Sequence, residues 1–187
     1  SVSQNDNAEY CRCPTCEAIN TREDSPAAAN LLLVNAVAER VEQTHPGVMV
    51  GTLTYWYTRK PPKTITPRRN LQHQLCSIEC CTLHPINDPD CALNRLFCAD
   101  LAGWKAKSDD IWIWNYNTNF PCYDLPFPNL KSIGPNVKLF LDSHAKGVFM
   151  QGNANSDAGE MCELRNYVIS KCLWKPGLDS WALAQRF

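Results

Sequence analysis

The chain has 187 residues, of which 44% are hydrophobic and 20% charged, a composition typical of a folded globular protein. Its formal net charge of -1 provides no basic field that would attract nucleic acid or an anionic membrane surface. The apolar runs end well before the roughly 20 residues that a membrane span needs. We therefore expect a soluble protein with neither nucleic acid nor a membrane as a partner.

Eleven cysteines are far above ordinary usage, and such a density is typical of proteins that form disulfides outside the cytosol. We therefore expect a secreted or extracellular protein. Because the number is odd, at least one cysteine has no partner within the chain. The disulfide candidates are Cys11, Cys13, Cys16, Cys76, Cys80, Cys81, Cys91, Cys98, Cys122, Cys162 and Cys172.

Hydrophobic periodicity predicts strands and helices that alternate along the chain. The predicted strands are residues 1–4, 48–58, 71–80, 110–116 and 147–152. The predicted helices are residues 26–44, 91–107, 128–146, 156–174 and 178–187, of which 128–146 is expected to be broken. Ser25 and Ser156 are the expected caps, with Pro26 at a first helical position.

Strands separated by helices indicate βαβ units and a parallel sheet, so the fold class is α/β. Ligands of such folds lie at the carboxyl ends of the strands. The polar residues expected at those ends are Asp6, Tyr57, Glu79, Tyr116 and Gln151.

Several blocks of the sequence are familiar in this order: "SVSQNDN", "YCRCPTC", "TLTYWYTRKPP", "LCSIECCTLHPINDPDC", "IWNYNTNF" and "GVFMQGN". They resemble an uncharacterised family, a domain of unknown function in bacterial and invertebrate proteins that is regarded as a glycoside-hydrolase-like (β/α)8 barrel. The resemblance implies that residues 1–187 are one domain, the C-terminal βα units of a TIM-type barrel, about strands four to eight. The barrel is then incomplete, and its missing N-terminal half is expected from elsewhere in a precursor, from a second chain or from a homo-oligomer.

Glycosidic cleavage uses two carboxyl groups, and the candidates at strand ends are Asp6 and Glu79. The resemblance adds that Asp6 occupies the fourth-strand position, where barrel glycosidases commonly place an acid. The alternative for Asp6 is a turn, which Asn and Asp favour. The alternative for Glu79 is an ion pair with Arg59 or Arg95.

Asn115 is a departure from the family, whose sequences often read "IWDY" where this chain has "IWNY". An amide keeps the hydrogen bonding of a carboxylate but removes its charge and basicity. If that Asp is catalytic in relatives, this chain would bind sugar without cleaving it.

Further substrate-binding candidates surround the same strand ends. Asn5 and Asn7 are expected to hydrogen-bond sugar hydroxyls, and Tyr57, Trp114 and Tyr116 to stack on pyranose faces. Gln151 and Glu160 are candidate hydrogen-bonding partners near the last strand. The alternative is that the rings fill the barrel core.

The spacing C-x-C-x-x-C offers three thiolates to zinc, and "CSIECC" with His84 and Cys91 offers a second set. Disulfides remain the favoured interpretation, with Cys80 or Cys81 bonded to Cys91, so neither a metal nor a cofactor is expected. Cys162 and Cys172 lie on one predicted helix, about 15 Å apart, and cannot pair with each other.

Two functions follow. The first is a secreted glycoside-hydrolase-like protein that binds, and in its enzymatic form hydrolyses, a glycan at the strand ends. The second is a non-catalytic carbohydrate-binding or disulfide-linked structural protein on the same barrel.

Overall fold

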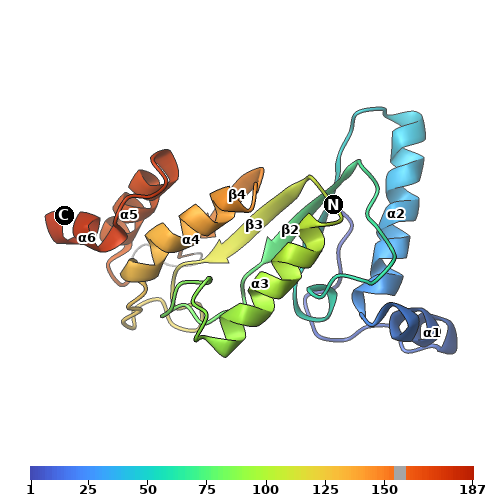
Figure 1. Ribbon diagram of the computed structural model, residues 1–187, viewed down its shortest axis with the longest axis horizontal. Coiled ribbons are helices and arrows are strands. Elements are labelled where there is room, and N and C mark those ends of the chain that lie inside the picture. The colour runs from blue at the N-terminus through green and yellow to red at the C-terminus, as the bar shows by residue number, and fades with distance from the viewer. Residues whose placement is uncertain (154–158) are drawn as a thin grey trace. The chain divides into compact units, whose positions relative to one another are not determined.

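A computed structural model describes residues 1–153 and 159–187 (Figure 1). The elements follow the order α1 (Pro14–Glu23), α2 (Ala27–Thr44), β1 (Val50–Thr54), the short 3-10 helix η1 (Trp56–Thr58), β2 (Leu71–Cys76), α3 (Ala92–Lys105), β3 (Ile111–Tyr116), α4 (Leu130–Asp142), β4 (Gly147–Gln151), α5 (Cys162–Trp174) and α6 (Ser180–Arg186). The four strands form a parallel sheet in the order β1-β2-β3-β4. The α/β class with a parallel sheet is therefore confirmed.

The chain divides into two compact units. Unit 1 comprises residues 1–76 and 100–113, and unit 2 comprises residues 77–99 and 114–187. None of the helices in the described ranges is both long and apolar enough to cross a membrane.

In unit 1, β1 and β2 pair in parallel, with Val50 opposite Leu71 and Thr54 opposite Leu75. Alternate residues of both strands are buried, which is the period expected of a sheet with one packed face. Helix α2 buries the stripe Leu31, Val34 and Ala38, among others. The Ser25 hydroxyl accepts a hydrogen bond from the Ala27 amide at 3.1 Å, so the predicted start of this helix holds to within one residue.

Residues 1–4 were predicted to be a strand, and this prediction is wrong. The Val2 amide donates to the Gly51 carbonyl at 2.8 Å, as a ladder would require. The next donor on β1, the Leu53 amide, bonds instead to the Ser3 hydroxyl at 3.0 Å. A side chain thus takes the place of a backbone acceptor, and the ladder stops after one bond.

Helix α1 lies where the sequence predicted a loop, and it contacts α2 (Figure 1). Its apolar pattern is weak, but Pro14 stands at its first position, where the missing N–H costs nothing. Its last residue, Glu23, is buried and anchors the loop between η1 and β2. The Glu23 carboxylate accepts hydrogen bonds from the Thr64 amide at 2.7 Å, the Thr64 hydroxyl at 2.7 Å and the Ile65 amide at 3.1 Å.

In unit 2, helices α4, α5 and α6 lie side by side (Figure 1) and bury a common cluster that includes Ile133, Val137, Val168 and Leu183. The sequence predicted a broken helix at residues 128–146, because Pro135 lies inside it. This prediction is wrong, since α4 is continuous.

The continuity of α4 at Pro135 is explained by a hydrogen bond from α6. Pro135 has no N–H to donate to the carbonyl four residues earlier, that of Lys131. The Ser180 hydroxyl donates to this carbonyl at 3.3 Å instead. Gly134, next to Pro135, is required by packing, because an added Cβ would lie 2.7 Å from the Leu178 carbonyl oxygen.

Other boundaries also differ. The first long strand is 50–54 rather than 48–58, and β2 ends at Cys76 rather than residue 80. Helix α5 begins at Cys162, and its predicted cap, Ser156, lies outside the described residues. Helix α3 at 92–105 and helix α6 at 180–186 confirm the predicted helices at 91–107 and 178–187.

Candidate functional site

A hollow of about 410 Å³ lies in unit 1 between the N-terminal segment, α1, α2 and the turn after β1. It brings together Asn5 and Tyr57, two of the predicted substrate-binding residues. It adds Tyr10 and Asn30, which the sequence analysis missed. The rings of Tyr10 and Tyr57 lie with centroids 5.0 Å apart and planes tilted by 35°.

The hollow therefore combines aromatic rings with amide side chains, which is the usual composition of a small-molecule site. Burial raises the pKa of the Tyr57 hydroxyl, so this group is a neutral hydrogen-bond donor at physiological pH. The Arg12 guanidinium lies over the Tyr10 ring, 4.6 Å from its centroid. No motif in the sequence distinguished Tyr10 except its place directly before the first cysteine.

Asp6 lies next to the residues of this hollow in the chain, and its carboxylate is held by Tyr55. The Tyr55 hydroxyl, on a ring that is 6% exposed, donates to Asp6 Oδ1 at 2.9 Å. Burial, and then the hydrogen bond to the Asp6 carboxylate, raise the pKa of Tyr55 to about 12. Asn7, in contrast, serves a turn, because its Oδ1 accepts from the Glu9 amide at 2.9 Å.

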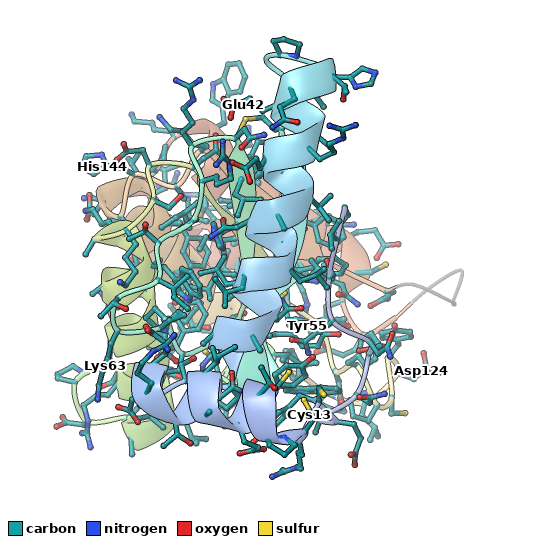
Figure 2. All side chains as sticks on the ribbon, turned by 90° about the vertical axis from the view of Figure 1, so that its right-hand side faces the viewer. Cys13, Glu42, Tyr55, Lys63, Asp124 and His144 are labelled. Carbon is teal, nitrogen blue, oxygen red and sulfur yellow. The ribbon has the colours of Figure 1, made fainter. Side chains whose placement is uncertain are left out.

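Three thiols, those of Cys11, Cys13 and Cys16, lie within 4.8 Å of one another at the beginning of α1. Cys13 is labelled in Figure 2, as is Tyr55. Hydrogen bonds from the Cys16 amide and from the two neighbouring thiols lower the pKa of Cys13. Hydrogen bonds to the Cys13 thiol and then to the Cys11 thiol raise the pKa of Cys16 to about 11. Of these two thiols the arrangement thus favours a thiolate at Cys13, and Cys11 and Cys16 also line the hollow.

Unit 2 holds the other predicted sugar-stacking residues. The Trp114 indole donates to Gln151 Oε1 at 2.6 Å, so these two predicted site residues are in contact. Ring contacts run from Phe149 to Trp114, with centroids 4.6 Å apart, and from Trp114 to Tyr116, at 6.3 Å. The row continues from Tyr116 through Phe120 to Tyr123.

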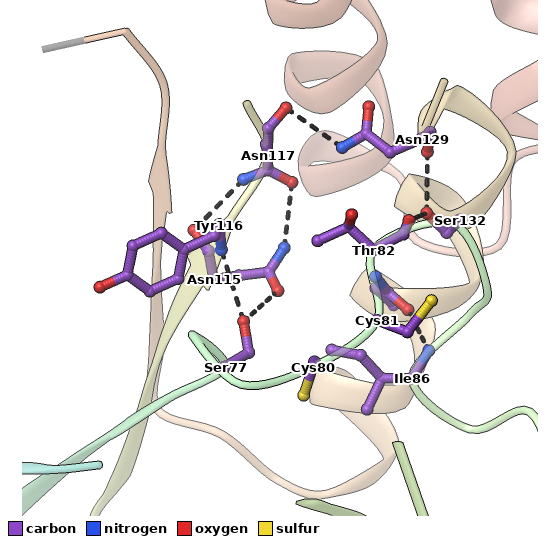
Figure 3. A pocket seen from close by; sticks show the side chains of 11 residues that line it. Ser77, Cys80, Cys81, Thr82, Ile86, Asn115, Tyr116, Asn117, Asn129 and Ser132 are labelled. Atoms are coloured by element: carbon purple, nitrogen blue, oxygen red, sulfur yellow. Dashed lines mark hydrogen bonds between the residues drawn. The ribbon is translucent and has the colours of Figure 1, made fainter. Parts of the chain in front are cut away.

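Asn115 lies in a network of neutral side chains that borders a small polar cavity (Figure 3). It is 2% exposed. The Ser77 hydroxyl donates to its Oδ1 at 2.9 Å, and its Nδ2 donates to Asn117 Oδ1 at 3.0 Å. Asn129 Nδ2 donates to the Asn117 carbonyl at 3.1 Å. Both the oxygen and the nitrogen of the Asn115 amide are therefore hydrogen-bonded to neighbouring side chains. Asn115 thus holds Ser77 and Asn117 in position.

The remaining predicted acids lie apart from the strands. Glu79 is half-buried in the turn after β2, where the Cys80 amide donates to the Ser77 carbonyl at 3.0 Å. It belongs to unit 2, whereas Asp6 belongs to unit 1. Glu160 forms an ion pair with Arg165, which is 4% exposed. Arg59, one suggested partner of Glu79, pairs with Asp100 at 2.7 Å.

The predicted disulfides are not present in the described residues, where all eleven cysteines are free thiols. Cys76 and Cys172 are buried, and Cys11, Cys13 and Cys122 are exposed. A second cluster, of Cys81, His84 and Cys91, lies in unit 2. The first set that the sequence offered as zinc ligands, Cys11, Cys13 and Cys16, thus comes together. Of the cysteines in "CSIECC", only Cys81 joins His84 and Cys91, and Cys76 and Cys80 are not in that cluster.

The described residues define a mixed α/β protein with a parallel sheet. The family model described as "Domain of unknown function (DUF4838)" matches residues 1–187, so the chain belongs to this family. No curated protein and no solved structure matches the chain.

Proposed function

We propose that the chain is a secreted glycoside-hydrolase-like protein that binds carbohydrate in the hollow of unit 1. The observation that carries the proposal is that Asn5, Tyr10 and Tyr57 meet in this hollow. Pyranose rings present apolar C–H faces that stack on aromatic rings, and amides pair with their hydroxyls. Its volume of about 410 Å³ suits one or two sugar rings.

Binding is tested with a glycan array and then by calorimetry with the sugar that the array selects. Tyr57→Ala is expected to weaken binding at least tenfold, because it removes a stacking face. Trp174→Ala is the matched control, since that ring is 91% exposed and lies on α5 in unit 2. Equal affinities of the two variants would contradict the location of the site.

Hydrolysis is the second candidate, and the contact between Asp6 and Tyr55 favours it. The hydrogen bond from the buried Tyr55 hydroxyl holds the Asp6 carboxylate in place, as a nucleophile or base must be held. Turnover of aryl glycosides should be lost in Asp6→Asn, and it should survive in Asp124→Asn, an exposed control. Binding without turnover would contradict hydrolysis and support the non-catalytic carbohydrate-binding alternative.

The aromatic row of unit 2 supplies a further stacking surface for the same ligand class. Phe120 and Phe149 are 52% and 46% exposed, so the row is open to solvent. Tyr116→Ala is expected to weaken the binding of glycans that stack on this row.

The architecture that we infer is the C-terminal part of a (β/α)8 barrel, about strands four to eight. Four parallel strands follow chain order, with α3 between β2 and β3 and α4 between β3 and β4, whereas β1 and β2 are joined by a loop that contains η1. The order of the strands supports this inference, because barrel strands are ordered in this way. The missing half would come from another segment, a second chain or a homo-oligomer. Native mass spectrometry tests the second chain and the homo-oligomer, because a stable monomer of 21.1 kDa would contradict both.

A further inference from the structure

A cluster of one imidazole and two thiols lies in the loop between β2 and α3, entirely within unit 2. The sulfurs of Cys81 and Cys91 and a ring nitrogen of His84 all lie within 4.8 Å of one another. Cys81 Sγ and His84 Nδ1 are 3.3 Å apart. The three residues come from two ends of a loop, ten positions apart, so their meeting is not a consequence of local spacing.

A buried side chain holds this arrangement. Asn94, on α3, is 0% exposed. Its Oδ1 accepts from the Cys81 amide at 2.8 Å, and its Nδ2 donates to the Cys81 carbonyl at 3.0 Å, the Pro85 carbonyl at 3.0 Å and the His84 carbonyl at 3.4 Å. One side chain thus fixes the backbone of two of the three cluster residues before any ligand binds.

The third residue is fixed by the helix itself. Cys91 directly precedes α3, and its carbonyl accepts from the Arg95 amide at 3.0 Å. The Cys91 amide donates to the Asp88 carbonyl at 3.3 Å. A helix N-terminus favours negative charge, which suits a thiolate ligand at this position.

We propose that Cys81, His84 and Cys91 bind a zinc ion. Two thiolates and an imidazole are ligands that zinc prefers, in a tetrahedral geometry. With Zn–S near 2.3 Å and Zn–N near 2.0–2.1 Å, the ligand atoms of such a site are about 3.5–3.8 Å apart. Cys81 Sγ and His84 Nδ1, 3.3 Å apart, already lie closer than this. The Cys91 sulfur needs to move by about 1 Å or less. A water molecule would complete the four ligands.

The competing explanation is a disulfide between Cys81 and Cys91, which the sequence analysis favoured. A disulfide accounts for two members of the cluster and leaves the approach of His84 unexplained. Zinc accounts for all three. In either case the loop is cross-linked, but only the metal makes the cross-link depend on the imidazole.

The site would also stabilise the neighbouring polar cavity. Cys81 and Thr82 are among the residues that line this cavity (Figure 3). The Ser132 hydroxyl donates to the Thr82 carbonyl at 2.9 Å, which ties the same loop to α4. Metal binding would therefore hold one wall of the cavity that contains Asn115.

His84→Ala separates the two explanations, because it removes the imidazole and leaves both thiols in place. The measurement is the zinc content of the full chain by elemental mass spectrometry after dialysis. We expect His84→Ala, Cys81→Ser and Cys91→Ser each to lose one equivalent of zinc relative to the parent chain. His45→Ala, which removes an exposed histidine of unit 1, and Cys13→Ser, which alters the other thiol cluster, should keep that equivalent.

A second measurement does not depend on whether the variants of Cys81, His84 and Cys91 fold. Cobalt titrated into the Cys13→Ser chain should show the charge-transfer absorption of a thiolate-bound ion. Full zinc content in a folded His84→Ala would overturn the proposal, and so would a parent chain without zinc in which non-reducing peptide mapping finds Cys81 bonded to Cys91.

Discussion

The two units bury their polar groups in different ways. Unit 1 encloses ionisable side chains, His73 at 2% exposure and Glu23 at 1%. The polar cavity of unit 2 is surrounded by amides and hydroxyls, with Asn115 at its centre. Arg165 borders that network through Asn129 and is paired with Glu160. Unit 1 should therefore respond to pH, whereas the network of unit 2 should not.

The largest effect is expected from Asn94→Ala in unit 2. The change removes the hydrogen bonds that hold Cys81, His84 and Pro85, and it leaves buried backbone groups unpaired. In the metal-free chain we expect a loss of about 3–4 kcal/mol in the free energy of unfolding, the same at pH 6 and pH 8. Urea unfolding measures it. Asn20→Ala in unit 1 removes the hydrogen bond from the Ala29 amide to Asn20 Oδ1 and should lose about 1 kcal/mol. Equal losses would contradict the role of Asn94.

Asn115→Asp gives unit 2 the pH dependence that it lacks. The new carboxylate would face Asn117 Oδ1, which now accepts from the Asn115 amide. Burial would raise the pKa of this carboxyl above about 3.9, its value in the unfolded chain. Relative to the parent chain, stability is then unchanged below pH 4 and falls by about 2–3 kcal/mol as the pH rises toward 8. Asn87→Asp, at an exposed position, is the control, and a difference in stability from the parent chain that is the same at pH 4 and pH 8 would contradict the prediction.

His73 gives unit 1 the opposite dependence. Its ring lies against Trp104 with centroids 4.6 Å apart, and burial lowers its pKa to about 4. Its pKa in the unfolded chain is about 6.5, so stability is complete above that pH and is lost as the pH falls. Between pH 8 and pH 5 the loss is about 2 kcal/mol. His73→Phe should remove this dependence, and His144→Gln should keep it; thermal unfolding across the pH range decides.

Glu23 gives unit 1 a second window of pH in which stability changes, at more acidic pH than that of His73. Hydrogen bonds from the Thr64 hydroxyl and amide lower its pKa to about 2. Its contribution is therefore complete above pH 4.5 and is lost as the pH falls toward 2. Glu23→Gln should flatten this second window and leave the His73 window unchanged.

The smallest effect concerns the thiols. Cys13 is exposed and has a lowered pKa, whereas burial raises the pKa of Cys172 in unit 2. The thiolate is the reactive form, so iodoacetamide should modify Cys13 before Cys172 at pH 7 in metal-free protein. Cys16→Ala should slow the reaction of Cys13, because it removes the thiol that hydrogen-bonds to Cys13. Peptide mapping after brief labelling shows the order, and prior modification of Cys172 would contradict it.

Much of the fold was predictable because it depends on local pattern. The alternation in β1, β2 and β3 and the helical spacing in α2 and α3 identify these elements within the window that forms them. The predictions were wrong where a residue distant in the chain forms a hydrogen bond that the local pattern does not reveal. The Ser3 hydroxyl ends the pairing of residues 1–4, and the Ser180 hydroxyl keeps α4 continuous at Pro135.

The residues of the candidate site were likewise predicted only in part. The sequence selected Asn5, Tyr57, Trp114 and Gln151, because polar and aromatic residues at strand ends are visible along the chain. It did not select Tyr10, whose ring meets that of Tyr57 across 47 positions. It also interpreted the cysteines as disulfides, since composition reports how many thiols there are and not how far apart their sulfurs lie.

The sequence by itself determined the α/β class, most of the helices and strands and the family resemblance, since each of these depends on residue type and short-range order. Only the tertiary structure decided which side chains meet. It placed Asn5 and Tyr57 in one hollow, gave Asn115 neutral partners at both ends of its amide, and brought His84 to Cys81 and Cys91. The physical reason is that such contacts depend on the folded path of the backbone, which residues distant in the chain, such as Asn94, hold in place.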